Sequence, residues 1–97
     1  MRFEILLAPE AIEDLRRLDP GVRSGVRAAL ELHLRHEPTR VSRSRIKRLR
    51  GLLRPQYRLR VGEVRVFYDV VEAEVQVLAI VAKSTAARRL AEIGEEG

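Results

Sequence analysis

The chain lacks cysteine and long apolar runs and has few aromatic residues, and each of these features excludes a class of protein or of site. None of its 97 residues is cysteine, which excludes disulfides and thiolate metal sites and suits a reducing, cytoplasmic location. Only two Phe and two Tyr are aromatic, so we expect a core of Leu, Val, Ile and Ala. No apolar run approaches the roughly 18 residues of a membrane span, and an early acid, Glu4, argues against a signal peptide. We expect one domain over residues 1–97.

The most informative absence is that of acids from one part of the chain. Nineteen basic against fourteen acidic residues give a net charge of +5, and seventeen of the nineteen are arginine. Residues 38–62 contain no acid, and their basic residues are Arg40, Arg43, Arg45, Lys47, Arg48, Arg50, Arg54, Arg58 and Arg60. Arginine-biased codon usage would explain arginine over lysine, but not this window. The segment therefore suits a polyanion or an acidic protein partner.

The first third of the chain predicts a strand followed by a helical hairpin. Residues 3–7 form a short apolar run typical of a strand. Pro9 fits the first turn of a helix, and Asp19-Pro20 signals a second one, with Asp as N-cap. We expect that helix to run to about Glu37, because a proline follows and disfavours helical geometry before it. Its expected apolar face consists of Val22, Val26, Ala29, Leu30 and His33.

The rest of the chain predicts a basic loop, a three-stranded meander and a short helix. Residues 40–54 have no clean period and are expected to form an irregular loop. Period-two alternation then begins, with Gly62-Glu63 as a two-residue hairpin loop. A second turn near Glu72-Ala73 leads to a last strand over 75–82. Ser84 or Thr85 is expected to cap a final helix that Gly94 ends, and residues 95–97 are expected to fray.

This order predicts the α+β class, with the helices grouped on one side of a mostly antiparallel sheet. Alternation assigns the strand residues to two faces. The face expected to take the helices consists of Leu59, Val61, Val64, Val66, Tyr68 and Val70. The other face is expected to present Arg58, Arg60, Arg65, Phe67 and Asp69.

The hairpin register sets two arginines against each other. It pairs Arg60 with Arg65, and like charges directly opposite in a sheet are destabilising unless an anion bridges them. The alternative is that Asp69, Glu63 or Glu74 neutralises them. The neighbouring segment without acids favours an anion, and the planar arginine fork suits a phosphate.

Other chemistry-bearing residues give weaker signals. Lys47 and Lys83, the only lysines, are either general acids or bases with a depressed pKa or solvated surface residues. His33 is expected to pack half-buried and His36 to be exposed. Neither histidine has a partner at metal-ligand spacing, so we expect no metal site and no cofactor.

Three segments in order carry a resemblance to a known family. They are KRLRG at 47–51, QYRLRVGEVRVFYDV at 56–70 and VQVLAIVAK at 75–83. With these segments the chain resembles the RelE/ParE toxins of type II toxin–antitoxin systems over nearly its whole length. The resemblance implies an N-terminal strand, a helical hairpin, an antiparallel meander and a short C-terminal helix.

The RelE-like branch implies an activity and a site. Its members are endoribonucleases that cut mRNA in the ribosomal A site without a metal, in the cytoplasm, and a cognate antitoxin neutralises them. By position, the resemblance assigns catalysis to Arg58, Arg60, Arg65 and Lys83. It assigns RNA binding to Lys47, Arg48, Arg50 and Arg54. The implied partners are therefore the antitoxin, in a complex with the toxin, and the ribosome with its mRNA.

The C-terminal part departs from the nuclease pattern. Active nucleases of the family typically have a second arginine after the last strand and a tyrosine near the C-terminus. Here those places hold Lys83-Ser84 and, approximately, Leu90. Two alternatives therefore stay open: a ParE-like inhibitor of DNA gyrase, and a catalytically weak relative that binds RNA or protein.

Overall fold

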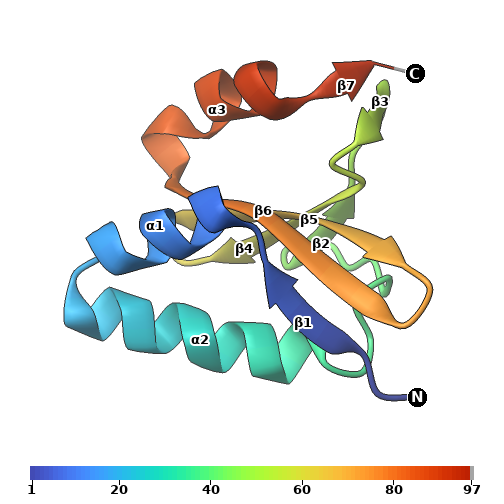
Figure 1. Cartoon of the computed structure of the whole chain (residues 1–97), viewed down its shortest axis with the longest axis horizontal. Coiled ribbons are helices and arrows are strands. Elements are labelled where there is room, and N and C mark those ends of the chain that lie inside the picture. Colours follow the sequence, from blue (N-terminus) through green and yellow to red (C-terminus); the bar gives the residue numbers. More distant parts are fainter. Residues whose placement is uncertain (97) are drawn as a thin grey trace.

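The computed structural model describes residues 1–96 and contains the predicted elements in the predicted order (Figure 1). The strands are β1 (Glu4–Leu7), β2 (Ile46–Arg48), β3 (Leu52–Arg54), β4 (Tyr57–Val61), β5 (Val64–Val71), β6 (Glu74–Ala82) and β7 (Glu95–Glu96). The helices are α1 (Pro9–Arg17), α2 (Pro20–Leu34) and α3 (Ala86–Ile93), and a 3-10 turn, η1 (Lys83–Thr85), precedes α3. No helix of residues 1–96 is both long and apolar enough to cross a membrane.

The main sheet has five strands in the order β1-β6-β5-β4-β2. Only β1 is parallel to its neighbour, β6, so the sheet is mostly antiparallel as predicted. The hairpin register is also confirmed: Leu59 lies opposite Val66, Arg60 opposite Arg65 and Val61 opposite Val64. Gly62 adopts a φ of 56° in the tight turn, and glycine accommodates this value without strain because it has no Cβ.

The predicted helix-facing residues do form the main core. Leu59, Val66 and Tyr68 are fully buried and pack against apolar side chains of α1 and α2. The expected apolar face of α2 is wrong in one position, because Val22 is 44% exposed while Leu34, which was not included, is fully buried. Arg23 beside Val22 instead donates to the Leu15, Arg16 and Leu18 carbonyls at the end of α1.

The helices are not all on one side of the sheet. Figure 1 shows α3 on the face opposite α1 and α2. It covers a second, smaller cluster in which Phe67, Ala79 and Val81 are buried. The sheet is therefore covered on both faces, and the sequence pattern missed this because α3 is short and contributes no fully buried residue.

The basic segment and the C-terminus are more ordered than predicted. Residues 40–54 contain β2, which pairs with β4, and β3, which pairs with β7. Glu95 and Glu96 are therefore paired rather than frayed, and Gly97 lies outside the described residues. Strands of two or three residues are too short to produce a period in the sequence.

Candidate functional site

Three strands place basic residues on the sheet face that α1 and α2 leave uncovered. Lys47 of β2 lies opposite Arg58 of β4, and Arg60 of β4 lies opposite Arg65 of β5. Because successive strand residues alternate between faces, Arg58 and Arg60 flank Leu59, which points into the core. We call Lys47, Arg58, Arg60 and Arg65 the cationic face.

Arg58 is the most unusual member of the cationic face. It is half-buried, and its Nε is buried without a hydrogen-bond partner in the described structure. Burial lowers the pKa of its guanidinium, and the nearby charges of Arg65 and Arg60 lower it further. A buried unsatisfied donor costs about 1–3 kcal/mol. An anion bound at Arg58 would relieve both the missing hydrogen bond and the repulsion.

Arg65 is held in place by its own turn. It is only 7% exposed, and its Nη1 donates to the carbonyls of Gly62 at 2.8 Å and Val64 at 3.1 Å. Arg60, directly opposite, is exposed. Arg65 therefore supplies a fixed positive charge beneath the surface, while Arg60 can reach a ligand in solvent.

The acids proposed as alternative partners do not neutralise this face. Asp69 is 2% exposed and accepts hydrogen bonds from Arg54 Nε at 2.8 Å and from the Gln56 backbone N–H at 2.7 Å. Within residues 1–96, no ion pair joins a carboxylate to any member of the cationic face. The structure thus favours an external anion over internal pairing.

The remaining basic candidates lie in different surroundings. The guanidinium of Arg48 lies 5.1 Å from the centre of the Tyr57 ring, and its Nη1 donates to the Gln56 carbonyl at 2.9 Å. Arg54 forms an ion pair with Asp69. Arg50 is exposed in the bend after β2. The structure therefore brings together the cationic face but not the whole set of basic residues expected to hold RNA.

Lys83 lies at the turn end of the hairpin. Its backbone N–H donates to the Glu63 carbonyl at 2.7 Å, which holds the start of η1 beside the β4–β5 turn. Glu63, Ala82, Lys83 and Ser84 line a hollow of about 310 Å³ there. Lys83 is exposed and lies two residues after Val81, the residue opposite Arg65.

An apolar wall borders the cationic face. Phe67 lies opposite Arg58 across the β4–β5 ladder, and Leu90 and Ile93 of α3 pack against the cluster that contains Phe67. Leu90, at the place where the family pattern has a tyrosine, is therefore a packing residue here.

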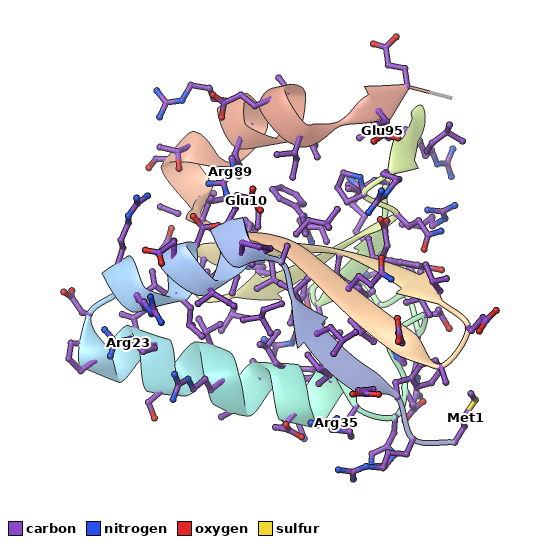
Figure 2. All side chains as sticks on the ribbon, viewed as in Figure 1. Met1, Glu10, Arg23, Arg35, Arg89 and Glu95 are labelled. Atoms are coloured by element: carbon purple, nitrogen blue, oxygen red, sulfur yellow. The ribbon has the colours of Figure 1, made fainter. Side chains whose placement is uncertain are left out.

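A partly buried ion pair holds α3 over this wall. Arg89 reaches from α3 toward α1 (Figure 2) and donates to both oxygens of Asp14, at 3.1 and 2.9 Å. The Asp14 carboxylate also accepts from the Ile80 N–H at 3.0 Å. Sequence reasoning missed this pair, although an acid between Ala11 and Leu15 on an apolar stripe is itself a signal for a buried partner.

Comparisons with known proteins identify the fold. No family model matches the sequence, and no curated protein matches it. The toxin–antitoxin complex RelBE2 of Mycobacterium tuberculosis matches with a TM-score of 0.70 and 25% identity, covering 84% of this chain and 99% of that chain. The chain has the RelE fold.

Other matching structures agree with this assignment. The isolated E. coli RelE toxin has a TM-score of 0.65 at 21% identity, covering 91% of this chain and 98% of that one. The YoeB dimer of Staphylococcus aureus has a TM-score of 0.63 at 20% identity, covering 81% and 94%. The predicted α+β class and the resemblance to RelE-like toxins are thereby confirmed at the level of the fold. Several of these RelE-like structures are complexes with an antitoxin.

Proposed function

We propose that this RelE-like chain is the toxin of a type II toxin–antitoxin system and that it cleaves mRNA on the ribosome. The observation that carries the proposal is the half-buried Arg58, whose Nε has no partner and whose neighbours on the face are also cations. A site that only supported the fold would be expected to neutralise such a charge. A phosphodiester supplies the missing negative charge and hydrogen-bond acceptors.

The chemistry that such a face supports is transfer within the RNA chain. The 2′-hydroxyl gives its proton to water and attacks the neighbouring phosphorus, so that the O2′–P bond forms. The P–O5′ bond breaks as the 5′-oxygen takes a proton from water. Negative charge builds on the phosphoryl oxygens in the transition state. Fixed cationic donors at those oxygens lower the barrier, because they need no reorganisation. We assign Arg58 to these oxygens as the preorganised donor, and Arg60 as a second, exposed donor that reaches them from solvent.

The other basic residues then take supporting roles. Arg65, fixed beneath the face, adds positive potential, and Lys83 supplies a cation at the turn end of the hairpin. Lys47, beside Arg58, and the exposed Arg48 and Arg50 are proposed to contact flanking phosphates. Arg54 is proposed to contribute less to RNA binding, because its charge is paired with Asp69.

The proposed inhibitor of this activity is a cognate antitoxin. The RelE relatives solved as complexes were solved with such partners. An acidic segment laid over the cationic face would neutralise it and exclude RNA.

A reconstituted translation assay tests the nuclease proposal. The purified protein is added to translating ribosomes, and the mRNA ends are mapped. We expect codon-associated cuts from the wild type and at least a 100-fold slower rate from Arg58→Gln, as for the loss of one preorganised donor. Arg27→Gln is the matched control, since it removes the same charge from an exposed position on α2 away from the cationic face.

The assay also separates the alternatives. Intact mRNA under conditions where a known relative cuts would overturn the nuclease proposal. Inhibition of DNA supercoiling by gyrase, with mRNA intact, would instead support the ParE-like function. Equal cutting by Arg58→Gln and Arg27→Gln would place the reacting phosphate elsewhere.

A further inference from the structure

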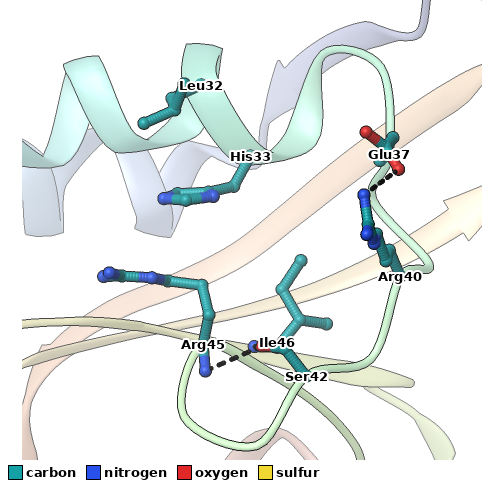
Figure 3. Close-up of a pocket in the computed structure, with 7 residues that line it drawn as sticks. All are labelled: Leu32, His33, Glu37, Arg40, Ser42, Arg45 and Ile46. Atoms are coloured by element: carbon teal, nitrogen blue, oxygen red, sulfur yellow. Dashed lines mark hydrogen bonds and ion pairs between the residues drawn. The ribbon is translucent and has the colours of Figure 1, made fainter.

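A second basic surface lies away from the cationic face, between the end of α2 and the loop that leads to β2. Figure 3 shows His33 of α2 and Arg45 of the loop extending side by side, with Glu37 and Arg40 at the far end. The hollow between them has a volume of about 330 Å³. We call it the α2 groove, and it is lined by Leu32, His33, Glu37, Arg40, Ser42, Arg45 and Ile46.

The α2 groove has exposed apolar surface. Leu32 is 76% exposed although it lies on a helix, and Val41 in the adjoining loop is 57% exposed. Among the lining residues, Ile46 is buried and apolar. Leu32 lines the hollow with most of its side chain exposed, so it offers apolar surface that a bound molecule can remove from water.

The charge of the α2 groove is positive and held in a fixed geometry. Its acid, Glu37, is already paired with Arg40 at 3.0 Å. The loop around Arg45 is fixed because its backbone N–H donates to Ser42 Oγ at 3.0 Å, and Arg45 Nη1 donates to the Arg60 carbonyl at 3.2 Å. Burial and the charge of Arg45 lower the pKa of His33, which favours the neutral imidazole. Arg45 is therefore the cation that an incoming acid would meet.

The position of the groove connects it to the proposed active surface. Ile46 lines the groove, and the next residue, Lys47, lies on the other face of β2 opposite Arg58. β2 is an edge strand of the main sheet, paired on one side only, with β4. A chain that leaves the groove and crosses this edge reaches the cationic face within a few residues.

We infer that the α2 groove docks an acidic, amphipathic segment of the antitoxin, an inference that rests on the proposed toxin–antitoxin function. Apolar side chains of the segment cover Leu32, and a carboxylate meets Arg45, since Arg40 is already paired with Glu37. RNA is a poorer occupant, because a phosphate backbone offers nothing to cover the aliphatic side chains. The same partner, continued across β2, would then screen Lys47 and Arg58.

A peptide of defined chemistry tests the inference without the natural antitoxin. The probe is a synthetic helical peptide with leucines on one face and glutamates on the other, and its control carries lysine at every glutamate position. We expect the acidic peptide to shift the methyl NMR signals of Leu32, Val41 and Ile46. We expect the lysine peptide to bind at least 10-fold more weakly, since it meets the positive rim with like charge.

Two pairs of variants locate the binding. Leu32→Gln and Arg45→Gln should each weaken the acidic peptide at least 5-fold. The matched controls, Val22→Gln on the same helix and Arg27→Gln, should change its affinity less than 2-fold. Equal binding of both peptides, methyl shifts confined to other surfaces, or no binding would overturn the inference. So would a uridine oligonucleotide that shifts the same methyls at lower concentration, because it would make the groove an RNA site.

The outcome is independent of the nuclease proposal. Leu32→Gln is expected to cut ribosome-bound mRNA at the wild-type rate, because Leu32 does not touch the cationic face. Peptide docking without any mRNA cutting would leave the groove standing and overturn the nuclease. Normal cutting of mRNA without peptide docking would support the nuclease proposal and overturn the proposed docking at the groove.

Discussion

The two faces of the central sheet bury their side chains in different ways. Under α1 and α2, Leu59, Val66 and Tyr68 are fully buried, and the Tyr68 hydroxyl donates to the Pro38 carbonyl at 2.6 Å. On the opposite face, α3 covers a small apolar cluster, and Arg58 beside it keeps a buried Nε without a partner. A single strand, β4, contributes to both faces through alternate residues.

Buried acids make the contrast sharper. Asp14 and Asp69 each accept at least two hydrogen bonds and form an ion pair, so each buried acid is fully matched. Arg58 differs from these acids, because its buried Nε has no partner within residues 1–96 and its charged neighbours are also cations. Proteins tolerate such local faults mainly where function needs them. This difference supports the proposal that one face stabilises the fold and that the other binds a ligand.

The largest expected effect comes from the helix-covered face. Leu59→Ala should lower the free energy of unfolding by about 3 kcal/mol, because it removes buried apolar surface and leaves a cavity. Urea denaturation measures this, with Leu53→Ala, 61% exposed, as the control of small effect. A loss below about 1 kcal/mol for Leu59→Ala would mean that this face is less closely packed than described.

The next effect concerns the ion pair that joins the two faces. Asp14→Asn should cost about 2 kcal/mol, since it weakens charge-assisted hydrogen bonds to Arg89 and to the Ile80 N–H. Amide hydrogen exchange should become faster in α3 than in α2, because Arg89 no longer fastens that helix. Asp19→Asn, at an exposed site, is the matched control. Unchanged exchange in α3 would show that its apolar contacts suffice to hold it.

The effect expected at Arg58 has the opposite sign. Arg58→Gln should raise the free energy of unfolding by about 1 kcal/mol, because it removes a buried unsatisfied donor and a like-charge repulsion. Arg60→Gln, exposed, should change stability by less than about 0.5 kcal/mol. Urea denaturation in low salt distinguishes the two variants. Destabilisation by Arg58→Gln would mean that Arg58 supports the fold and would remove the main argument for a ligand.

Much of this contrast could be predicted from the sequence, because β4 and β5 follow strict period-two alternation. That pattern alone placed Leu59 inward and set Arg60 opposite Arg65. The partners of the charges could not be predicted. Asp69 shares the parity of the arginines, yet it pairs with Arg54, because the corner before β4 brings Arg54 and Gln56 to it. The place of α3 likewise depends on Arg89 and Asp14, which are 75 residues apart.

The smallest expected effect tests the charge of the α2 groove. Because burial and Arg45 lower the pKa of His33, the imidazole binds a proton more readily in the unfolded chain than in the folded chain. The resulting stability is present above the ordinary pKa of 6.5 and is lost as the pH falls below it. The free energy of unfolding of the wild type minus that of His33→Gln should therefore decrease as the pH falls from 7.5 to 5. A difference that grows on acidification would mean that a carboxylate stabilises protonated His33. An acid of the chain itself, such as Glu37 in the lining, would then neutralise the groove, and the argument for an acid from a partner would fall.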